Sequence, residues 1–198
     1  MDAFEKAFKF TISFEGGYAN DPNDYGGETI AGISRVYWPK WSGWRKIDAA
    51  KSQPNFPSSL YDNEELIESV KNFYRLNFWN PIKGDDLAAG SIDIAAEAFD
   101  AGVNMGTGRA AKFIQTALNI FNRNGASYSE IVVDGAIGGA TLGAYNSFLR
   151  RDDPQLFLKA MLIQRGAFYG KRAVEDSSQE RFIRGWLNRL TIDKGLDD

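Results

Sequence analysis

Residues 15–34, EGGYANDPNDYGGETIAGIS, are the most informative segment of this chain. It begins with a carboxylate at the end of an amphipathic segment and continues through a glycine-rich turn that carries Asp21 and Asp24. Two carboxyl groups in different surroundings suit the cleavage of glycosidic bonds, because one keeps its proton while the other stays ionised. The stretch therefore indicates a glycan-cleaving site between a first helix and a small lobe.

Glu15 is the candidate acid of this site. Four apolar or aromatic residues lie within one or two helical turns of it in sequence, and desolvation by such neighbours raises the pKa of a carboxyl group. These residues are Phe8, Ile12, Phe14 and Tyr18. The alternative interpretation is a solvated glutamate at the end of a helix.

Asp21 and Asp24 compete for the role of second carboxylate. They follow Glu15 by six and nine residues, in a turn that Gly26 and Gly27 allow to double back. Thr29 then offers a hydroxyl that can hold a water molecule or a sugar group. Aspartates also favour turns for local hydrogen-bonding reasons, so a purely structural role stays open.

The chain contains no histidine and no cysteine among its 198 residues. Serine–histidine and cysteine–histidine hydrolases, zinc peptidases and disulfide scaffolds are therefore excluded. Proton transfer near neutral pH falls to carboxylates, lysine or tyrosine. We expect neither a metal nor another cofactor.

The distribution of charge and the hydropathy of the chain limit the kinds of partner that it can bind. Lys+Arg and Asp+Glu number 10 and 16 in residues 1–100, and 13 and 10 in residues 101–198. This split is too weak for a nucleic-acid binder, which shows a concentrated basic stripe. No apolar run approaches the ~18 residues of a membrane span, and the N-terminus does not resemble a signal peptide. A wall substrate would then require export through a holin or a dedicated secretion machinery.

The hydrophobic periodicity predicts a mainly α fold with a small hairpin or irregular lobe over residues 18–35. A glycine-rich turn over residues 102–108 divides the chain into parts 1–101 and 102–190 that pack as one body, followed by a disordered tail over 191–198. Helices are predicted over residues 2–14, 62–80, 91–100, 109–124, 153–173 and 179–190.

Aromatic residues and one asparagine are further binding candidates. Residues 38–44 contain three of the five tryptophans, and sugars stack on indole rings. Trp38 and Trp41 are therefore candidate substrate contacts, with packing of a long loop onto the core as the alternative. Trp79 and Trp186 are expected in the core or between helices. Asn104, in the predicted turn, either contacts substrate or stabilises the turn.

The pattern EGGY–ND–D–GG–T–GIS over residues 15–34 resembles the opening motif of glycoside hydrolase family 108, a family of N-acetylmuramidases. Residues 99–106, FDAGVNMG, and 133–142, VDGAIGGATL, are similar to the family's second half, a predicted peptidoglycan-binding domain. The resemblance covers most of residues 1–180. It implies a lysozyme-like helical fold that cuts the glycan strands of peptidoglycan.

The resemblance also implies residue roles. Glu15 would protonate the glycosidic oxygen, and Asp24 would be the second carboxylate, because it follows the glutamate at the spacing found in phage-type lysozymes. Thr29 falls near their threonine, although its distance from Asp24 differs by one residue. Tyr18 and Asp21 are assigned to substrate binding, and Asp21 also remains a competitor of Asp24.

Three functions remain open on sequence alone. The first is an endo-acting muramidase that acts in the periplasm or outside the cell after export or lysis. The second is a non-catalytic wall-binding or secretion-assisting module. The third is a related glycan cleaver with another substrate, such as chitin, or another outcome, such as that of a lytic transglycosylase.

Overall fold

The computed structural model describes residues 1–12, 17–20, 27–194 and 196. The described residues form a mainly helical fold with a small antiparallel sheet early in the chain, as predicted. The contacts between residues divide the chain into two compact units. The sheet unit comprises Phe8–Asn77, and the helical unit comprises Met1–Ala7 and Phe78–Asp198.

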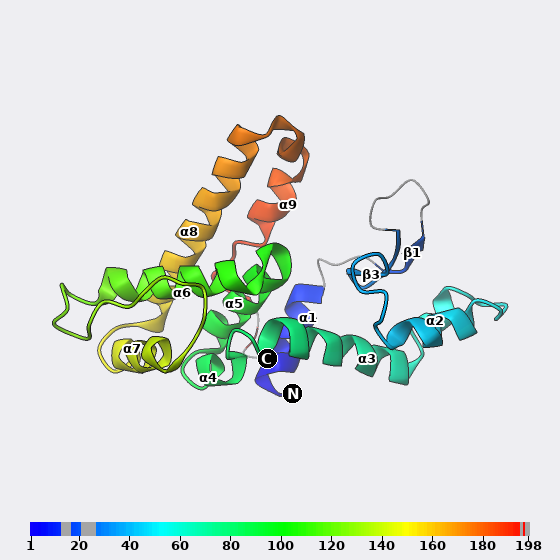
Figure 1. Cartoon of the computed structure of the whole chain (residues 1–198), viewed down its shortest axis with the longest axis horizontal. Helices are drawn as coiled ribbons and strands as arrows, with labels where there is room; N and C mark the ends of the chain where they lie inside the picture. Colours follow the sequence, from blue (N-terminus) through cyan, green and yellow to red (C-terminus); the bar gives the residue numbers. More distant parts are fainter. Residues whose placement is uncertain (13–16, 21–26, 195, 197–198) are drawn as a thin grey trace. The chain divides into compact units, whose positions relative to one another are not determined.

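The sheet unit is built around three short strands, β1 (Ala19–Asn20), β2 (Glu28–Ile30) and β3 (Ile33–Ser34), of which β1 and β3 are labelled in Figure 1. They pair antiparallel in the order β1-β2-β3. Ala31 and Gly32 connect the last two strands with φ of 46° and 75°, as two-residue hairpin turns require. Tyr74 Oη donates to the Ala31 carbonyl at 2.6 Å and so ties this turn to the next helix of the unit.

Helices pack beside the sheet within the same unit. They are the end of α1 (Ala3–Ile12), α2 (Gly43–Ala50), the short 3₁₀ helix η1 (Ser58–Leu60), α3 (Glu64–Tyr74) and the start of the π-helical turn η2 (Arg75–Trp79). The Asn63 side chain caps α3 by accepting from the Leu66 N–H at 3.0 Å. The core of the unit is apolar, with buried Ile30, Ile33, Trp44, Ile47, Leu60, Leu66, Phe73 and Tyr74.

The helical unit is organised around α5 (Ile92–Met105), which is buried over the continuous stretch from Ile94 to Gly102. A helix buried on all sides needs neighbours on all sides. Three helices supply much of this cover: α4 (Gly84–Ala88), α6 (Thr107–Phe121) and α8 (Pro154–Glu175). Ser91 caps α5 by accepting from the Ile94 N–H. Trp79 is fully buried beside Phe4 and Phe99, which confirms its predicted core position.

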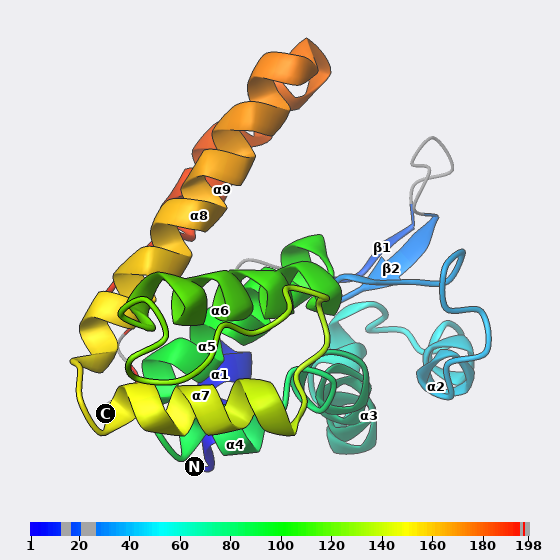
Figure 2. The same cartoon turned by 60° about the vertical axis from the view of Figure 1, so that its left-hand side comes forward.

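The remaining elements complete the helical unit. Helix α7 (Gly139–Leu149) packs on α6, and α9 (Ile183–Asn188) follows the 3₁₀ turn η3 (Ser177–Phe182) and runs back along α8 (Figure 2). Asp153 caps α8 and Pro154 occupies its first position, as the sequence predicts. None of the helices in the described part of the chain is long and apolar enough to cross a membrane.

The structure corrects several predicted boundaries. Helix α5 continues five residues beyond Asp100, because Gly102 is accommodated inside the helix and the break falls at Gly106, with φ of 91°. The predicted division at 101 and 102 therefore lies within continuous helix. The division of the chain into a muramidase part and a wall-binding part stays a prediction. Helix α6 ends at Phe121 because Arg123, Asn124 and Gly125 all adopt positive φ.

Candidate functional site

The predicted site residues fall in both units. Glu15, Asp21 and Asp24 lie outside the described residues. The sheet unit contains Tyr18, Thr29, Trp38 and Trp41, and the helical unit contains Asn104.

The backbone that follows the candidate acid is held by Tyr61. The Tyr18 N–H donates to Tyr61 Oη at 2.8 Å, and the Tyr18 ring packs edge-on against Phe56 with centroids 4.9 Å apart. A β-carbon on Gly17 would lie 2.4 Å from Tyr61 Oη. The second glycine of the motif is therefore explained by close approach of this phenol to the backbone.

Glu28 is a buried carboxylate of the sheet unit that contacts two cations and a tyrosine. It is 9% exposed, accepts from Tyr18 Oη at 2.9 Å and pairs with Arg35 at 3.1 Å and Lys51 at 2.8 Å. Burial and the hydrogen bond to Glu28 raise the pKa of Tyr18, and the hydrogen bond to Glu28 raises the pKa of Lys51. Asp48 bridges the same two cations at 2.9 Å each. Glu28 directly precedes Thr29, but no signal in the sequence marked it as a candidate site residue.

Thr29 is half-buried in the middle of β2, opposite Ala19 of β1 and Ser34 of β3. Its neighbours Glu28 and Ile30 are buried, so strand alternation places its side chain on the other face of the sheet. The sheet thus presents the Thr29 hydroxyl on one face and fixes the Tyr18–Glu28 pair through the other.

An aromatic hollow of about 400 Å³ lies elsewhere in the sheet unit. Tyr37 is 72% exposed and Trp38 is 40% exposed, whereas Trp41 is half-buried against Trp44 and Phe73. The Trp44 indole N–H donates to the Trp38 carbonyl at 2.7 Å and fixes the loop. The inner rings of this run pack on the core and the outer rings stay accessible, so the substrate contacts of Trp38 and Trp41 stay a prediction. Pro39, Lys40 and Asn77 complete the lining.

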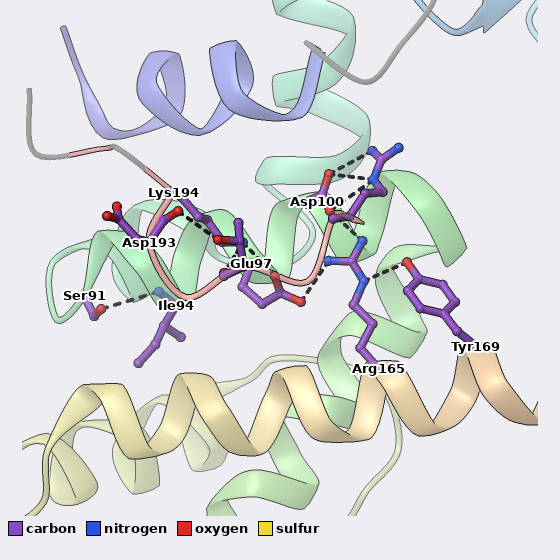
Figure 3. Close-up of polar contacts among 10 residues, drawn as sticks. Ser91, Ile94, Glu97, Asp100, Arg165, Tyr169, Asp193 and Lys194 are labelled. Atoms are coloured by element: carbon purple, nitrogen blue, oxygen red, sulfur yellow. Dashed lines mark hydrogen bonds and ion pairs between the residues drawn. The ribbon is translucent and has the colours of Figure 1, made fainter. Parts of the chain in front are cut away.

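A buried charge cluster supports the helical unit (Figure 3). It consists of Glu97 and Asp100 on α5, Arg165 on α8, Arg189 after α9, and Lys194. Arg165 bonds to Glu97 at 2.8 Å and to Asp100 at 2.5 Å, and both carboxylates are fully buried. Burial would raise the pKa of Asp100, but the charges of Arg165 and Arg189 hold it below its usual value.

The buried charge cluster includes Lys194 near the end of the chain and extends through Tyr169 to Asn104. Lys194, in the segment predicted as a disordered tail, is buried and donates to Glu97 at 3.0 Å. Arg165 Nε donates to Tyr169 Oη, which in turn donates to Asn104 Oδ1 at 2.8 Å. Asn104 lies in the last turn of α5 and not in the predicted turn. The hydrogen bonds through Tyr169 orient its side chain.

Gln115 organises a second polar region of the helical unit. Its amide donates to Asp134 at 2.7 Å and to the Ala136 carbonyl, and its carbonyl accepts from the Gly135 N–H at 2.8 Å. Gly135 has φ of 86°, which suits glycine. This loop borders a cavity of about 580 Å³ that also reaches Thr141 at the start of α7. Among the residues that the structure describes, no group of three acidic side chains is arranged to hold a metal.

Comparisons with known proteins define the class. Residues 109–191 match the model of a predicted peptidoglycan domain, and residues 8–106 match the model of glycosyl hydrolase 108. The protein is therefore a glycosidase whose substrate polymer is peptidoglycan. The chain belongs to the glycosyl hydrolase 108 family.

A solved structure supports the same assignment of fold. The chain is similar to Brucella abortus SagA, with 26% sequence identity and a TM-score of 0.60. The match covers 97% of this chain and 91% of the SagA chain. No protein with curated annotation matches the chain significantly.

Proposed function

We propose that this protein hydrolyses the β-1,4 bond between N-acetylmuramic acid and N-acetylglucosamine, with Glu15 as the general acid. Membership of the glycosyl hydrolase 108 family carries the proposal, because it joins the acid-rich segment to glycosidase chemistry. Asp24 is the second carboxylate, with Asp21 as its competitor, and Thr29 positions water or sugar.

The described neighbours of Glu15 support this assignment. Gly17 and Tyr18 are fixed by Tyr61, and Asn20 pairs with Glu28 across the segment that carries both aspartates. A catalytic group must be held by a rigid surrounding if it is to protonate a leaving group at a defined position. The Glu28 ion pairs hold the described strand residues of the motif in place.

The residues proposed to bind substrate are those that can contact the sugars of peptidoglycan. Trp38 and Trp41 line the aromatic hollow and are proposed to stack on sugar rings. Residues 109–191 are proposed to bind peptidoglycan, with the Gln115 loop and its cavity as one contact surface. A holin or a secretion machinery remains the proposed route to the wall.

Mass spectra of the fragments released from purified sacculi test the bond assignment. A muramidase leaves reducing N-acetylmuramic acid ends. Reducing N-acetylglucosamine ends would contradict the proposed bond, and 1,6-anhydro ends would show that a sugar hydroxyl, not water, completes the reaction.

A further inference from the structure

The helical unit contains a small polar cavity that the proposed catalytic chemistry does not use. Its volume is about 240 Å³, below the ~300–1,000 Å³ of sites that enclose drug-sized ligands. It therefore suits one terminal group, not a disaccharide. The lining residues are Asn104, Met105, Arg109, Phe168, Tyr169, Arg172 and Trp186.

Two arginines give this cavity its charge. The Arg109 guanidinium carbon lies 4.1 Å from the centroid of the Phe168 ring, which holds the planar group in place. Across residues 1–12, 17–20, 27–194 and 196, neither Arg109 nor Arg172 has a carboxylate within 4.0 Å. The acidic residue near Arg172 is Asp176. Its pKa is lowered mainly by hydrogen bonds from Ser178, and the charge of Arg172 lowers it further.

The other polar side chains of the cavity leave hydrogen-bond donors available. Asn104 Oδ1 is occupied by the Tyr169 hydroxyl, and Tyr169 Oη also accepts from buried Arg165. The Asn104 amide N–H₂ and the two guanidinium groups therefore remain, and all of them are donors. A ligand that satisfies them must be an acceptor, and guanidinium geometry matches a carboxylate.

The site is preformed by contacts outside it. The charge cluster fixes Tyr169 through Arg165, and the Trp186 ring stacks on Tyr169 with centroids 5.1 Å apart and an interplanar angle of 20°. This stacking forms an apolar wall beside the cationic groups. A pre-organised site loses less ordering entropy when it binds.

We propose that this cavity binds a free carboxylate of the peptide stem of peptidoglycan, with Arg109 and Arg172 as its ligands and Asn104 as an additional donor. The identity of the polymer rests on the proposed function. Five of the seven lining residues fall within the segment that matches the peptidoglycan domain, which favours a wall carboxylate over other anions.

Isothermal titration with a soluble disaccharide-tetrapeptide tests the proposal without requiring catalysis. Arg109→Gln combined with Arg172→Gln should weaken binding about tenfold or more, since two charge-assisted contacts are lost. The wild type should bind the methyl-esterified muropeptide equally weakly. Lys171→Gln is the matched control, because Lys171 lies on the same helix, is 71% exposed and does not line the cavity.

Unchanged affinity of the double variant, or no binding to the wild type, would overturn the proposal. Arginine-dependent binding of peptide-free glycan, whose lactyl carboxylate is free, would overturn the assignment to the stem peptide. Competition by millimolar inorganic phosphate, with no effect of esterification, would also overturn it. Thermal unfolding of each variant establishes that it is folded.

Release of reducing ends from sacculi, measured in parallel, separates this proposal from the enzymatic one. If the wild type releases reducing N-acetylmuramic acid ends but the arginine variants bind normally, the carboxylate site is wrong and the muramidase stands. If binding depends on the arginines but no reducing ends appear, the carboxylate site stands and the muramidase is wrong.

Discussion

Replacing Asp100 by asparagine tests whether charge balance holds the helical unit together. Asp100 is fully buried and accepts from Arg165 at 2.5 Å and from Arg189 at 2.8 Å. Among the described residues of the buried charge cluster, Asp100→Asn leaves Glu97 as the one acid beside three cations, two of which, Arg165 and Lys194, contact it. The variant should therefore be strongly destabilised.

The magnitude follows from the burial of the cluster. Removing one partner of a buried ion pair costs about 3–5 kcal/mol, a large part of the ~5–15 kcal/mol that holds a typical protein folded. For a chain of this size, about 2–4 °C of melting temperature is lost per kcal/mol. We therefore expect the melting temperature to fall by roughly 6–20 °C.

Two comparison variants make the test specific. Arg165→Met should cost less, about 1–3 kcal/mol, because Asp100 keeps Arg189 and Glu97 keeps Lys194. Lys171→Met, on the exposed side of α8, should stay within about 0.5 kcal/mol of the wild type. Urea and thermal unfolding measure all three. A loss below about 1 kcal/mol for Asp100→Asn, or a larger loss for Arg165→Met, would refute the charge-balance argument.

Two further predictions concern pH and the glycine motif. Burial raises the pKa of Asp100, but its two arginines hold the folded-state value below the unfolded ~3.9, so its contribution to stability is present above about pH 4 and is lost as the pH falls through the folded-state value. Thermal unfolding between about pH 2 and 6 should show this loss in the wild type, and an equal loss in Asp100→Asn would contradict it. Gly17→Ala should lower stability by about 1 kcal/mol and reduce sacculus cleavage, because the new β-carbon displaces Tyr61 Oη and breaks its bond to the Tyr18 N–H. Tyr61→Phe is the comparison variant, because it removes that bond without the clash. Equal cleavage by Gly17→Ala and by the wild type would be the contrary result.

Local signals predicted the elements with strong caps and clear periodicity. Asp153-Pro154 marked the start of α8, and the apolar stripe marked most of α6. Helix α2 was missed because its residues lie in an aromatic and glycine-containing run that is typical of a loop. Helix α5 was predicted too short, because a glycine such as Gly102 ends some helices and is buried inside others.

Long-range contacts could not be predicted from single segments. Arg165 meets Glu97 and Asp100 from 68 and 65 residues away, and Lys194 meets Glu97 from 97 residues away. No local pattern distinguishes these side chains from solvated charges. The same holds for Arg109 and Arg172, which line one cavity only because α6 and α8 pack together. In contrast, the motif around Tyr18 and Thr29 could be recognised because its residues are close in sequence.

The proposed activity depends on Glu15 donating a proton to the departing sugar. The most direct measurement is the rate of reducing-end release from purified sacculi by the wild type, Glu15→Gln and Asp24→Asn, with thermal unfolding recorded for each. We expect Glu15→Gln to retain the wild-type melting temperature and to lose at least about 100-fold in rate, the usual contribution of a general acid. Release by folded Glu15→Gln at the wild-type rate would contradict the account.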